Sequence, residues 1–500
     1  MQEITGLDYL QLTKGQRFAY KLKRFFTSIP NFFVNLGKKI WGAIKALIFG
    51  IGRFFKNLFI TFKEGDWKTR TSYFVMGFGS IARGQILRGL LFFAMEALFI
   101  LYMIFYGGYY LGKLGSLGMY YEETIEEGGV ILQEGVNSFN VLLYGVLTIF
   151  FIIAFLYTWN LNIKQNRINE QIAKDNKKLA SSGDDLRALV DKDFHKTLLA
   201  LPTIGIVIFT LVPIFFMILV AFTSYDKNHM PPNNLFGWVG CDNFNTLFNF
   251  GNGDAKFSMT FGQILLWTVV WAFFATFTNY FLGMLVAMLI NKKGIKLKKL
   301  WRTILVLSIA IPQFISLLYV GQMFQSDGII NNLIVQCGGK PIDFWGNPWL
   351  ARITVIIINI WIGIPYLMLV TTGILMNIPA DLYESANIDG ATPWQQYSKI
   401  TLPYMLFVTG PYLLTSFTGN MNNFNVIYLL TGGGPSDINM HQSANGSTDL
   451  LITWLFNLAV SDSDYKLAAV IGIMVFIVVA VISLIVYNIL PSTRNEEEFQ

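Results

Sequence analysis

Charged residues are scarce in this sequence. Asp, Glu, Lys and Arg make up 14% of the 500 residues, whereas hydrophobic residues make up 53% and aromatic residues 16%. The mean hydropathy is +0.48, and ordinary soluble domains contain about 25% charged residues. The shortage of charge therefore excludes an ordinary soluble protein and indicates one whose surface faces lipid.

Side chains that bind metals or activate nucleophiles are also few. The three histidines, His195, His229 and His441, lie far apart and none is in an HExxH pattern, so we expect no catalytic metal. No G-x-x-x-x-G-K-[ST] segment occurs, and the chain is not expected to hydrolyse ATP by itself. Cys241 and Cys337 lie in predicted external loops, where a disulfide could persist, but the sequence leaves their pairing open.

Long hydrophobic runs, in contrast, recur along the whole chain. A helix needs about 20 apolar residues to cross the hydrocarbon core of a bilayer, and eight runs are long enough. They predict an all-α integral membrane protein with about eight transmembrane helices, a bundle and not a barrel. The predicted spans are residues 89–110, 138–160, 197–222, 261–290, 303–325, 351–375, 404–430 and 466–490.

The basic residues lie on one side of these spans. Residues 1–88 and the second and fourth loops are rich in Lys and Arg, whereas the first loop is acidic. The positive-inside rule then places both termini and the sixth loop in the cytoplasm, with residues 491–500 as a cytoplasmic tail. The net charge of +6 is thus a topological signal and gives little reason to expect nucleic acid.

Residues 1–88 also contain an amphipathic segment. Apolar residues recur at helical spacing over residues 33–58, and Lys38, Lys45 and Arg53 interrupt them often enough to argue against a ninth span. The pattern predicts a helix lying on an anionic inner leaflet, and whether it has a specific function stays open. The first residues lack the apolar core of a signal peptide.

Ionisable residues are nearly absent from the predicted spans. Glu96 is the exception, and we expect it to pair locally; ion-coupled carriers commonly place several such groups inside their spans. Neutral polar residues instead recur at i, i+4 and i+7 in the sixth and seventh spans, either as facing walls of a site for an uncharged, hydroxyl-rich solute or as hydrogen-bonding partners of neighbouring helices. The two stripes are Asn359, Gly363 and Tyr366, and Ser416, Asn420 and Asn423.

The polar segment at residues 379–403 interrupts the apolar runs with its own helix signals. Asp381 favours a helix N-terminus, and Gly390 suits a left-handed C-cap. A second start follows at once, with Thr392 as N-cap and Gln395 completing a capping box. The segment predicts two short helices bent at a glycine, a protrusion that could dock in a partner's groove.

The same segment resembles the EAA motif of membrane subunits of binding-protein-dependent ABC importers, E-A-A-x3-G-x9-I-x-L-P. The spacing is complete, and Ser385 in place of alanine is the one departure. In that family the segment is the coupling helix that docks on the ATP-binding subunit. By this resemblance the coupling residues are Glu384, Ser385, Ala386, Gly390, Ile400, Leu402 and Pro403.

From about residue 200 onward the sequence resembles the larger, maltose-type sugar permease subunit of these importers. The segments GWVGCDNFNTLF, IPQFIS and FNVIYLLTGGGP contribute to the resemblance. Gly419 and Ile309 stand where that subunit has aromatic residues, and the third loop is short, so the sugar and its chain length stay open. By resemblance the substrate-binding residues are Asn359, Ile362, Gly363, Tyr366, Ser416, Asn420 and Asn423.

The resemblance implies a type I ABC importer permease fold. Its six-helix core would occupy residues 197–490, with the coupling helix at 379–403, and residues 89–196 would add two spans and a cytoplasmic loop. Implied partners are a second homologous permease subunit, two ATP-binding subunits, an extracytoplasmic sugar-binding protein, an oligosaccharide, most closely maltose or maltodextrin, and the lipid bilayer. No cofactor is expected on this chain, because the partner ATPase uses ATP and Mg²⁺.

Three alternatives remain at this point. The same importer architecture could serve another sugar. An ion-coupled secondary carrier would need ionisable residues inside the spans, which are nearly missing. A membrane enzyme would need clustered His, Cys or paired carboxylates at membrane depth, and no such cluster is visible in the sequence.

Overall fold

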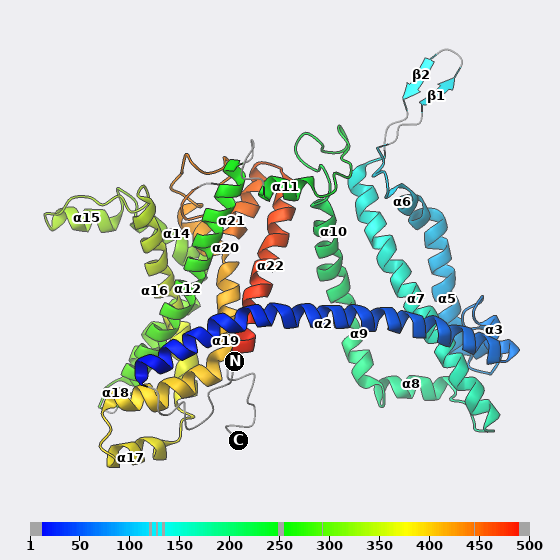
Figure 1. The fold of residues 1–500 in the computed structure, drawn as a ribbon, viewed down its shortest axis with the longest axis horizontal. Coiled ribbons are helices and arrows are strands. Elements are labelled where there is room, and N and C mark those ends of the chain that lie inside the picture. The colour runs from blue at the N-terminus through cyan, green and yellow to red at the C-terminus, as the bar shows by residue number, and fades with distance from the viewer. Residues whose placement is uncertain are drawn as a thin grey trace. The chain divides into compact units, whose positions relative to one another are not determined.

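The computed structural model describes residues 13–119, 123–126, 129–132, 136–248, 255–292, 294–444 and 446–489. Within them, seven helices are long and apolar enough to cross a membrane, and one bent helix pair is an eighth candidate span. These elements follow the eight predicted spans in order (Figure 1). The predicted helical membrane architecture is confirmed, and the tail predicted at 491–500 lies outside the described residues.

By their internal contacts the residues form two units, Met1–Phe216 and Met217–Gln500. This division falls inside the third span, beyond the predicted core boundary at residue 197. The helices and strands of the first unit are α2 (Lys14–Glu64), α3 (Trp67–Thr71), α4 (Phe78–Ile81), α5 (Ile86–Tyr102), η1 (Met103–Gly107), α6 (Gly108–Lys113), β1 (Glu123–Glu126), β2 (Gly129–Leu132), α7 (Ser138–Lys174), α8 (Ser182–Val190), α9 (Phe194–Ile206) and η2 (Val207–Leu211), and α10 (Val212–Val220) crosses the division.

Helix α2 is longer than the predicted amphipathic segment. It has 51 residues and begins with a capping box between Thr13 and Gln16, in which each side chain accepts from the other's backbone N–H. One stripe of the helix exposes large apolar side chains, as expected for a helix lying in a membrane interface. Exposed side chains of this stripe are Trp41, Ile44, Ile48, Ile51, Phe55, Phe59 and Phe62.

The segment after α2 is fixed to the end of α7 by buried polar side chains. Arg83 donates to Asp66 at 2.6 Å and to Asn166 at 3.1 Å, and its side chain is 4% exposed. Glu96 accepts from the backbone N–H of Met76 at 2.7 Å, which agrees with the local pairing expected from the sequence. One element is not predicted: β1 and β2 form a small antiparallel hairpin in the first loop.

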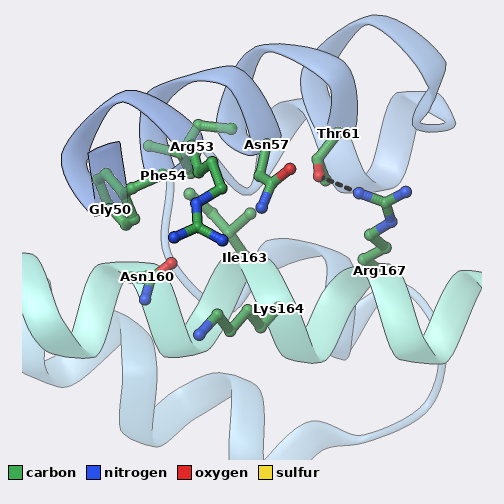
Figure 2. A pocket seen from close by; sticks show the side chains of 10 residues that line it. Gly50, Arg53, Phe54, Asn57, Thr61, Asn160, Ile163, Lys164 and Arg167 are labelled. Carbon is green, nitrogen blue, oxygen red and sulfur yellow. Dashed lines mark hydrogen bonds between the residues drawn. The ribbon is translucent and has the colours of Figure 1, made fainter. Parts of the chain in front are cut away.

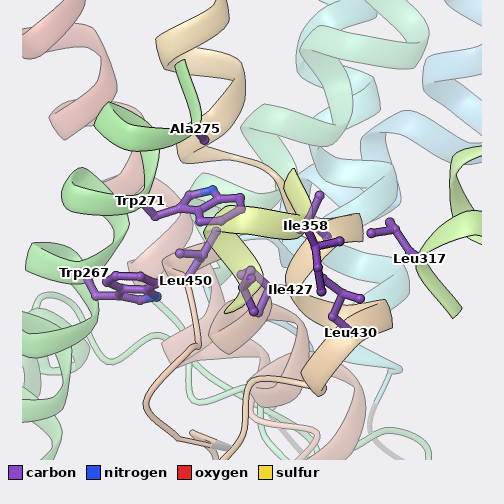
Figure 3. Packing of buried hydrophobic residues seen from close by; sticks show 10 residues of the cluster. Trp267, Trp271, Ala275, Leu317, Ile358, Ile427, Leu430 and Leu450 are labelled. Carbon is purple, nitrogen blue, oxygen red and sulfur yellow. The ribbon is translucent and has the colours of Figure 1, made fainter. Parts of the chain in front are cut away.

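The second unit is built around α12. Buried side chains of α12, α14, α16, α20 and the segment before α21 form an apolar cluster (Figure 3). The helices of this unit are α11 (Asp242–Phe248), α12 (Ala255–Asn291), α13 (Lys298–Ala310), α14 (Gln313–Met323), α15 (Ile329–Gln336), α16 (Pro348–Leu375), α17 (Ala380–Ile388), α18 (Pro393–Gln396), η3 (Tyr397–Thr401), α19 (Leu402–Met421), α20 (Phe424–Thr431), α21 (Leu451–Phe456), η4 (Asn457–Ser461) and α22 (Tyr465–Ile489). The cluster comprises Trp267, Trp271, Ala275, Leu317, Val355, Ile358, Val426, Ile427, Leu430 and Leu450.

The fifth span is broken. The sequence predicts one helix over 303–325, but α13 and α14 meet at an angle of 93°. Ile311, between them, is extended (φ −85°, ψ 126°), because the ring of Pro312 disfavours helical geometry in the preceding residue. The two half-helices replace the predicted straight span.

The seventh span is interrupted as well. The sequence predicts a continuous helix over 404–430, whereas α19 ends at Met421 and α20 begins at Phe424. Asn423 is the N-cap of α20, and its side chain accepts from the backbone N–H of Val426 at 3.4 Å. The prediction that Asn423 continues the helical face of α19 is therefore wrong.

Candidate functional site

The polar stripe of α16 faces α12. Asn359 is 6% exposed, and its backbone carbonyl accepts from the side chain of Asn279 at 3.5 Å. A Cβ built at Gly363 would lie 2.7 Å from Cγ of the same Asn279, so only glycine allows this approach. Ile362 packs on the apolar cluster, and Tyr366 is 52% exposed. Two of the three stripe residues, Asn359 and Gly363, thus pack against α12, and the side chain of Tyr366 remains exposed.

The polar stripe of α19 also reaches α12. The side chain of Asn420 donates to Oγ1 of Thr276 at 3.0 Å, and its backbone carbonyl accepts from the indole of Trp271 at 3.2 Å. Asn423 in turn donates to Oδ1 of Asn420 at 3.3 Å. These bonds place Asn420, in the last turn of α19, against the middle of the fourth span, and they link Asn423, just before α20, to Asn420.

The seven predicted substrate residues thus have different surroundings. Asn359, Gly363 and Asn420 contact α12, and Asn423 bonds Asn420. Ile362 packs on the apolar cluster, Tyr366 is exposed and Ser416 is partly buried.

Sequence reasoning missed the residues of α12 that organise this region. Thr276 and Asn279 are both buried polar side chains, three positions apart on one helix. Two atoms of the Asn279–Asn359 pair, Oδ1 of Asn279 and Nδ2 of Asn359, are buried without a hydrogen-bond partner among the described residues. Buried amides normally find partners, so this pair has unused hydrogen-bonding capacity. Polar residues at helical spacing in the fourth span are the signal that could have found it.

The predicted coupling segment has the predicted caps. Gly390 is left-handed (φ +73°), its N–H bonds Asn387 at 3.1 Å, and the next N–H bonds Ala386 at 2.9 Å, which is a Schellman motif. The Thr392–Gln395 capping box is present. These predictions are confirmed.

The second half of the segment is different from the prediction. α18 does not end before the membrane but continues through the π-helical turn η3 into α19, as one helix from Pro393. Pro403 lies in the first turn of α19, where its missing N–H costs little. Only α17 is therefore a separate short helix, tied back by a 2.9 Å bond between the hydroxyls of Tyr383 and Thr401.

The coupling segment exposes apolar surface. Ile388 is 87% exposed and Trp394 72% exposed. The motif residues Glu384, Ser385 and Gly390 are exposed as well. Exposed large apolar side chains on a polar protrusion are typical of a protein contact.

Neither the polar stripes nor the coupling segment contains a metal-binding cluster among the described residues. Among the described residues there is no group of three or more His, Cys, Asp or Glu side chains that could hold a metal ion. Cys241 and Cys337 are both exposed and free, so the open question of their pairing is answered against a disulfide in this structure. The neutral polar groups of α16 and α19 can hydrogen-bond a solute, and the exposed protrusion can contact another protein.

Helices long enough to span a membrane, neutral polar residues within them and an exposed, capped protrusion are features of a membrane transport component. Residues 279–495 match the family model described as binding-protein-dependent transport system inner membrane component. The chain is 32% identical over 450 residues to the maltodextrin transport system permease protein MalC of Streptococcus pneumoniae serotype 4, covering 87% of this chain and 98% of that protein. The chain belongs to this family of permeases.

Two further relatives extend the comparison. The galactooligosaccharides transport system permease protein GanP of Bacillus subtilis is 32% identical over 431 residues, 84% of this chain and 97% of that protein. A chain in the crystal structure of a bacterial ABC transporter involved in the import of the acidic polysaccharide alginate is 26% identical, with a TM-score of 0.50, over 63% of this chain and 100% of that chain. The protein is thus a multi-pass inner-membrane permease subunit of an ABC importer, a component without catalytic function of its own.

Proposed function

We propose that this permease passes uncharged oligosaccharides, most closely those of the maltodextrin class. The observation that supports this most directly is the chemistry of the two stripes, which consists of amides, a hydroxyl and a phenol. Asparagine offers a donor and an acceptor together, and an aromatic ring can stack on the apolar face of a sugar. Tyr366, Ser416 and the Asn279–Asn359 pair supply these groups. The names of MalC and GanP point to the same substrate class.

One cation lies on the same face of α16. Arg352 is two turns before Asn359, and its guanidinium lies 4.7 Å from the ring of Trp267 and 5.7 Å from that of Trp349. Its Nε also donates to the backbone carbonyl of Ser447 at 2.6 Å. The guanidinium already contacts two indole rings and a backbone carbonyl of the protein. It therefore has few free donors for a substrate carboxylate, which is in keeping with an uncharged solute.

The proposed partners follow from the family and from the protrusion. The importer would contain a second homologous permease subunit, two ATP-binding subunits that use ATP and Mg²⁺, and an extracytoplasmic sugar-binding protein. Both termini of this chain would lie in the cytoplasm, on the side of the ATP-binding subunits. The residues proposed to couple to them are Glu384, Ser385, Ala386, Gly390, Ile400, Leu402 and Pro403.

The continuous helix supports a mechanism for coupling. Because α18, η3 and α19 form one helix, a displacement of its first turn by a closing ATPase moves the helix that holds Asn420. Asn420 is bonded to Thr276 on α12, so the same movement would open or close the contact between α19 and α12. A substrate path beside α12, α16 and α19 would then open outward and inward in turn.

Uptake into proteoliposomes that contain the full importer tests the substrate. We expect ATP-dependent accumulation of maltodextrins, competed by other neutral oligosaccharides and not by alginate oligosaccharides or amino acids. Better competition by a charged solute would contradict the sugar proposal. Uptake that follows a proton or sodium gradient without ATP would instead establish a secondary carrier.

A substitution at Gly390 tests the coupling separately. Gly390→Trp places a bulky side chain at a left-handed position on the exposed protrusion. We expect the chain to reach the membrane and uptake to be abolished. Lys292→Trp, the same side chain at an exposed position of the fourth loop, is the control. Normal uptake by the Gly390 variant would exclude the proposed coupling role.

A further inference from the structure

A cavity of about 560 Å³ lies between α2 and the end of α7, within the first unit. Ligand pockets in proteins commonly have volumes of about 300–1,000 Å³, so this one is large enough for a small ligand group. Figure 2 shows side chains of both helices pointing into the space between them. The lining residues are Gly50, Arg53, Phe54, Asn57, Leu58, Thr61, Asn160, Ile163, Lys164 and Arg167.

The polar side of this cavity is entirely cationic or neutral. Arg53, Lys164 and Arg167 line it, and no acidic residue does. Within the described part of the chain, none of the three forms an ion pair with a carboxylate. Arg167 donates one hydrogen bond, 2.7 Å long, to the hydroxyl of Thr61, and this bond closes one end of the cavity (Figure 2). Among the described residues, these three cations line the cavity without a carboxylate counter-ion.

The other side of the cavity is apolar. At 100° per residue on α2, Phe54 and Leu58 lie between the cationic side at Arg53 and the exposed apolar stripe that contains Ile51 and Phe62. A ligand that fills the cavity therefore touches cations on one side and continuous apolar surface on the other. That combination suits an anion that carries an apolar chain better than a soluble inorganic anion.

The cavity also has the right position along the chain. α7 is apolar from its start at Ser138, and its basic residues Lys164 and Arg167 come only after the predicted span ends at residue 160. The positive-inside rule places this end at the cytoplasmic surface of the membrane, where anionic headgroups lie. The amphipathic helix α2 forms the second wall at the same depth.

We propose that this cavity is a binding site for the headgroup of an anionic phospholipid of the inner leaflet. Arg53, Lys164 and Arg167 would hold the phosphodiester, with Asn57 and Asn160 available to donate to it. The lipid tail would lie along Phe54 and Leu58 toward the apolar stripe of α2. A soluble phosphate compound carries the same phosphate group and could bind the same cations. The continuous apolar surface beside them favours a lipid as the ligand.

The test uses the full importer, purified in detergent and exposed to mixed micelles of phosphatidylglycerol or of phosphatidylcholine. Native mass spectrometry then counts the lipids retained per complex. We expect selective retention of phosphatidylglycerol. The triple variant Arg53→Gln, Lys164→Gln, Arg167→Gln should weaken it on the order of 100-fold, because each cation in contact with the headgroup contributes roughly fivefold.

A matched control removes the same number of charges from α2 outside the cavity. Lys38→Gln, Lys39→Gln, Lys56→Gln leaves the lining intact, and retention should stay as in the wild type. Lys164→Gln alone should cause a roughly fivefold loss of phosphatidylglycerol retention. Because Lys164 is exposed, this single variant should fold normally, and it tests the site even if the triple variant misfolds.

Three results would overturn the proposal. Equal loss in the cavity and control variants would mean unspecific attraction to charge. Equal retention of phosphatidylcholine would mean that the net negative charge of the headgroup is not recognised. Displacement of phosphatidylglycerol by millimolar inorganic phosphate would make the ligand a soluble anion instead of a lipid.

Discussion

At the scale of single residues, Gly363 provides a direct test of the contact between α16 and α12. Gly363→Ala would bring its Cβ to 2.7 Å from Cγ of Asn279, a buried side chain. Overpacking of this kind costs about 1–3 kcal/mol, so we expect a lower unfolding temperature and reduced sugar uptake. Both are measured on the reconstituted importer.

The control for this prediction lies on the same helix. At Gly373 a Cβ would meet nothing within 4 Å, and alanine is a better helix former than glycine by roughly 1 kcal/mol. Gly373→Ala should therefore leave uptake and the unfolding temperature unchanged or slightly raise the latter. Equal behaviour of the two variants would show that the Gly363 approach is not tight.

The residues of the stripes could be predicted from the sequence, but their partners could not. Spacing of i, i+4 and i+7 shows which side chains share a helical face, and Asn359 and Asn420 were found that way. It does not show what the face meets. Asn420 bonds Thr276 across 144 positions of sequence, a relation that only the packing of helices determines. The coupling residues were found by motif spacing instead, because their signals are local caps.

At the scale of elements, an ion pair fixes the loop after α10 to the first turn of α22. Asp226 accepts from Lys466 at 2.6 Å and from Nδ1 of His229 at 2.8 Å. Burial of the Asp226 carboxyl raises its pKa, but these bonds outweigh burial and lower the pKa from 3.8 to about 2. The pair thus favours the folded state while Asp226 is ionised.

This ion pair predicts a pH dependence. A carboxyl with a depressed pKa stabilises the folded state above its unfolded pKa of 3.8 and loses that effect as the pH falls toward about 2. Asp226→Asn should therefore lower the free energy of unfolding by roughly 2 kcal/mol near neutral pH. The deficit should shrink below about pH 4. Thermal unfolding in detergent measures it, with Asp327→Asn, an exposed carboxyl, as control. A deficit that is constant with pH would contradict the assignment.

The elements themselves were largely predictable, and the failures have local causes. Eight apolar runs gave eight spans because a bilayer demands length and hydrophobicity, both visible in sequence. The 93° bend in the fifth span was missed because Pro312 is compatible with a kinked helix as well as with a break. The continuation of α18 into α19 was missed because Pro403 indicates a boundary, although it fits the first turn of a helix.

At the scale of the whole molecule, the division into two units raises the question of how much of the chain is needed for transport. The family model covers residues 279–495, inside the second unit. A chain in the structure of the alginate transporter is matched over its full length by 63% of this chain. The family model therefore leaves out the first unit, whereas the alignment with MalC covers 87% of the chain and extends into that unit.

Two truncations decide where the transport core begins. A fragment of residues 193–500 keeps the whole third span, Phe194–Val220, whereas a fragment of residues 217–500 starts inside that span and cannot cross the membrane with the remaining four residues. We expect the longer fragment, expressed with the partner subunits, to support ATP-dependent uptake and the shorter one to fail. Loss of uptake by both, with the longer fragment present in the membrane, would instead make the first unit a part of the transport machinery. Retained uptake by the shorter fragment would show that the third span is not needed for transport.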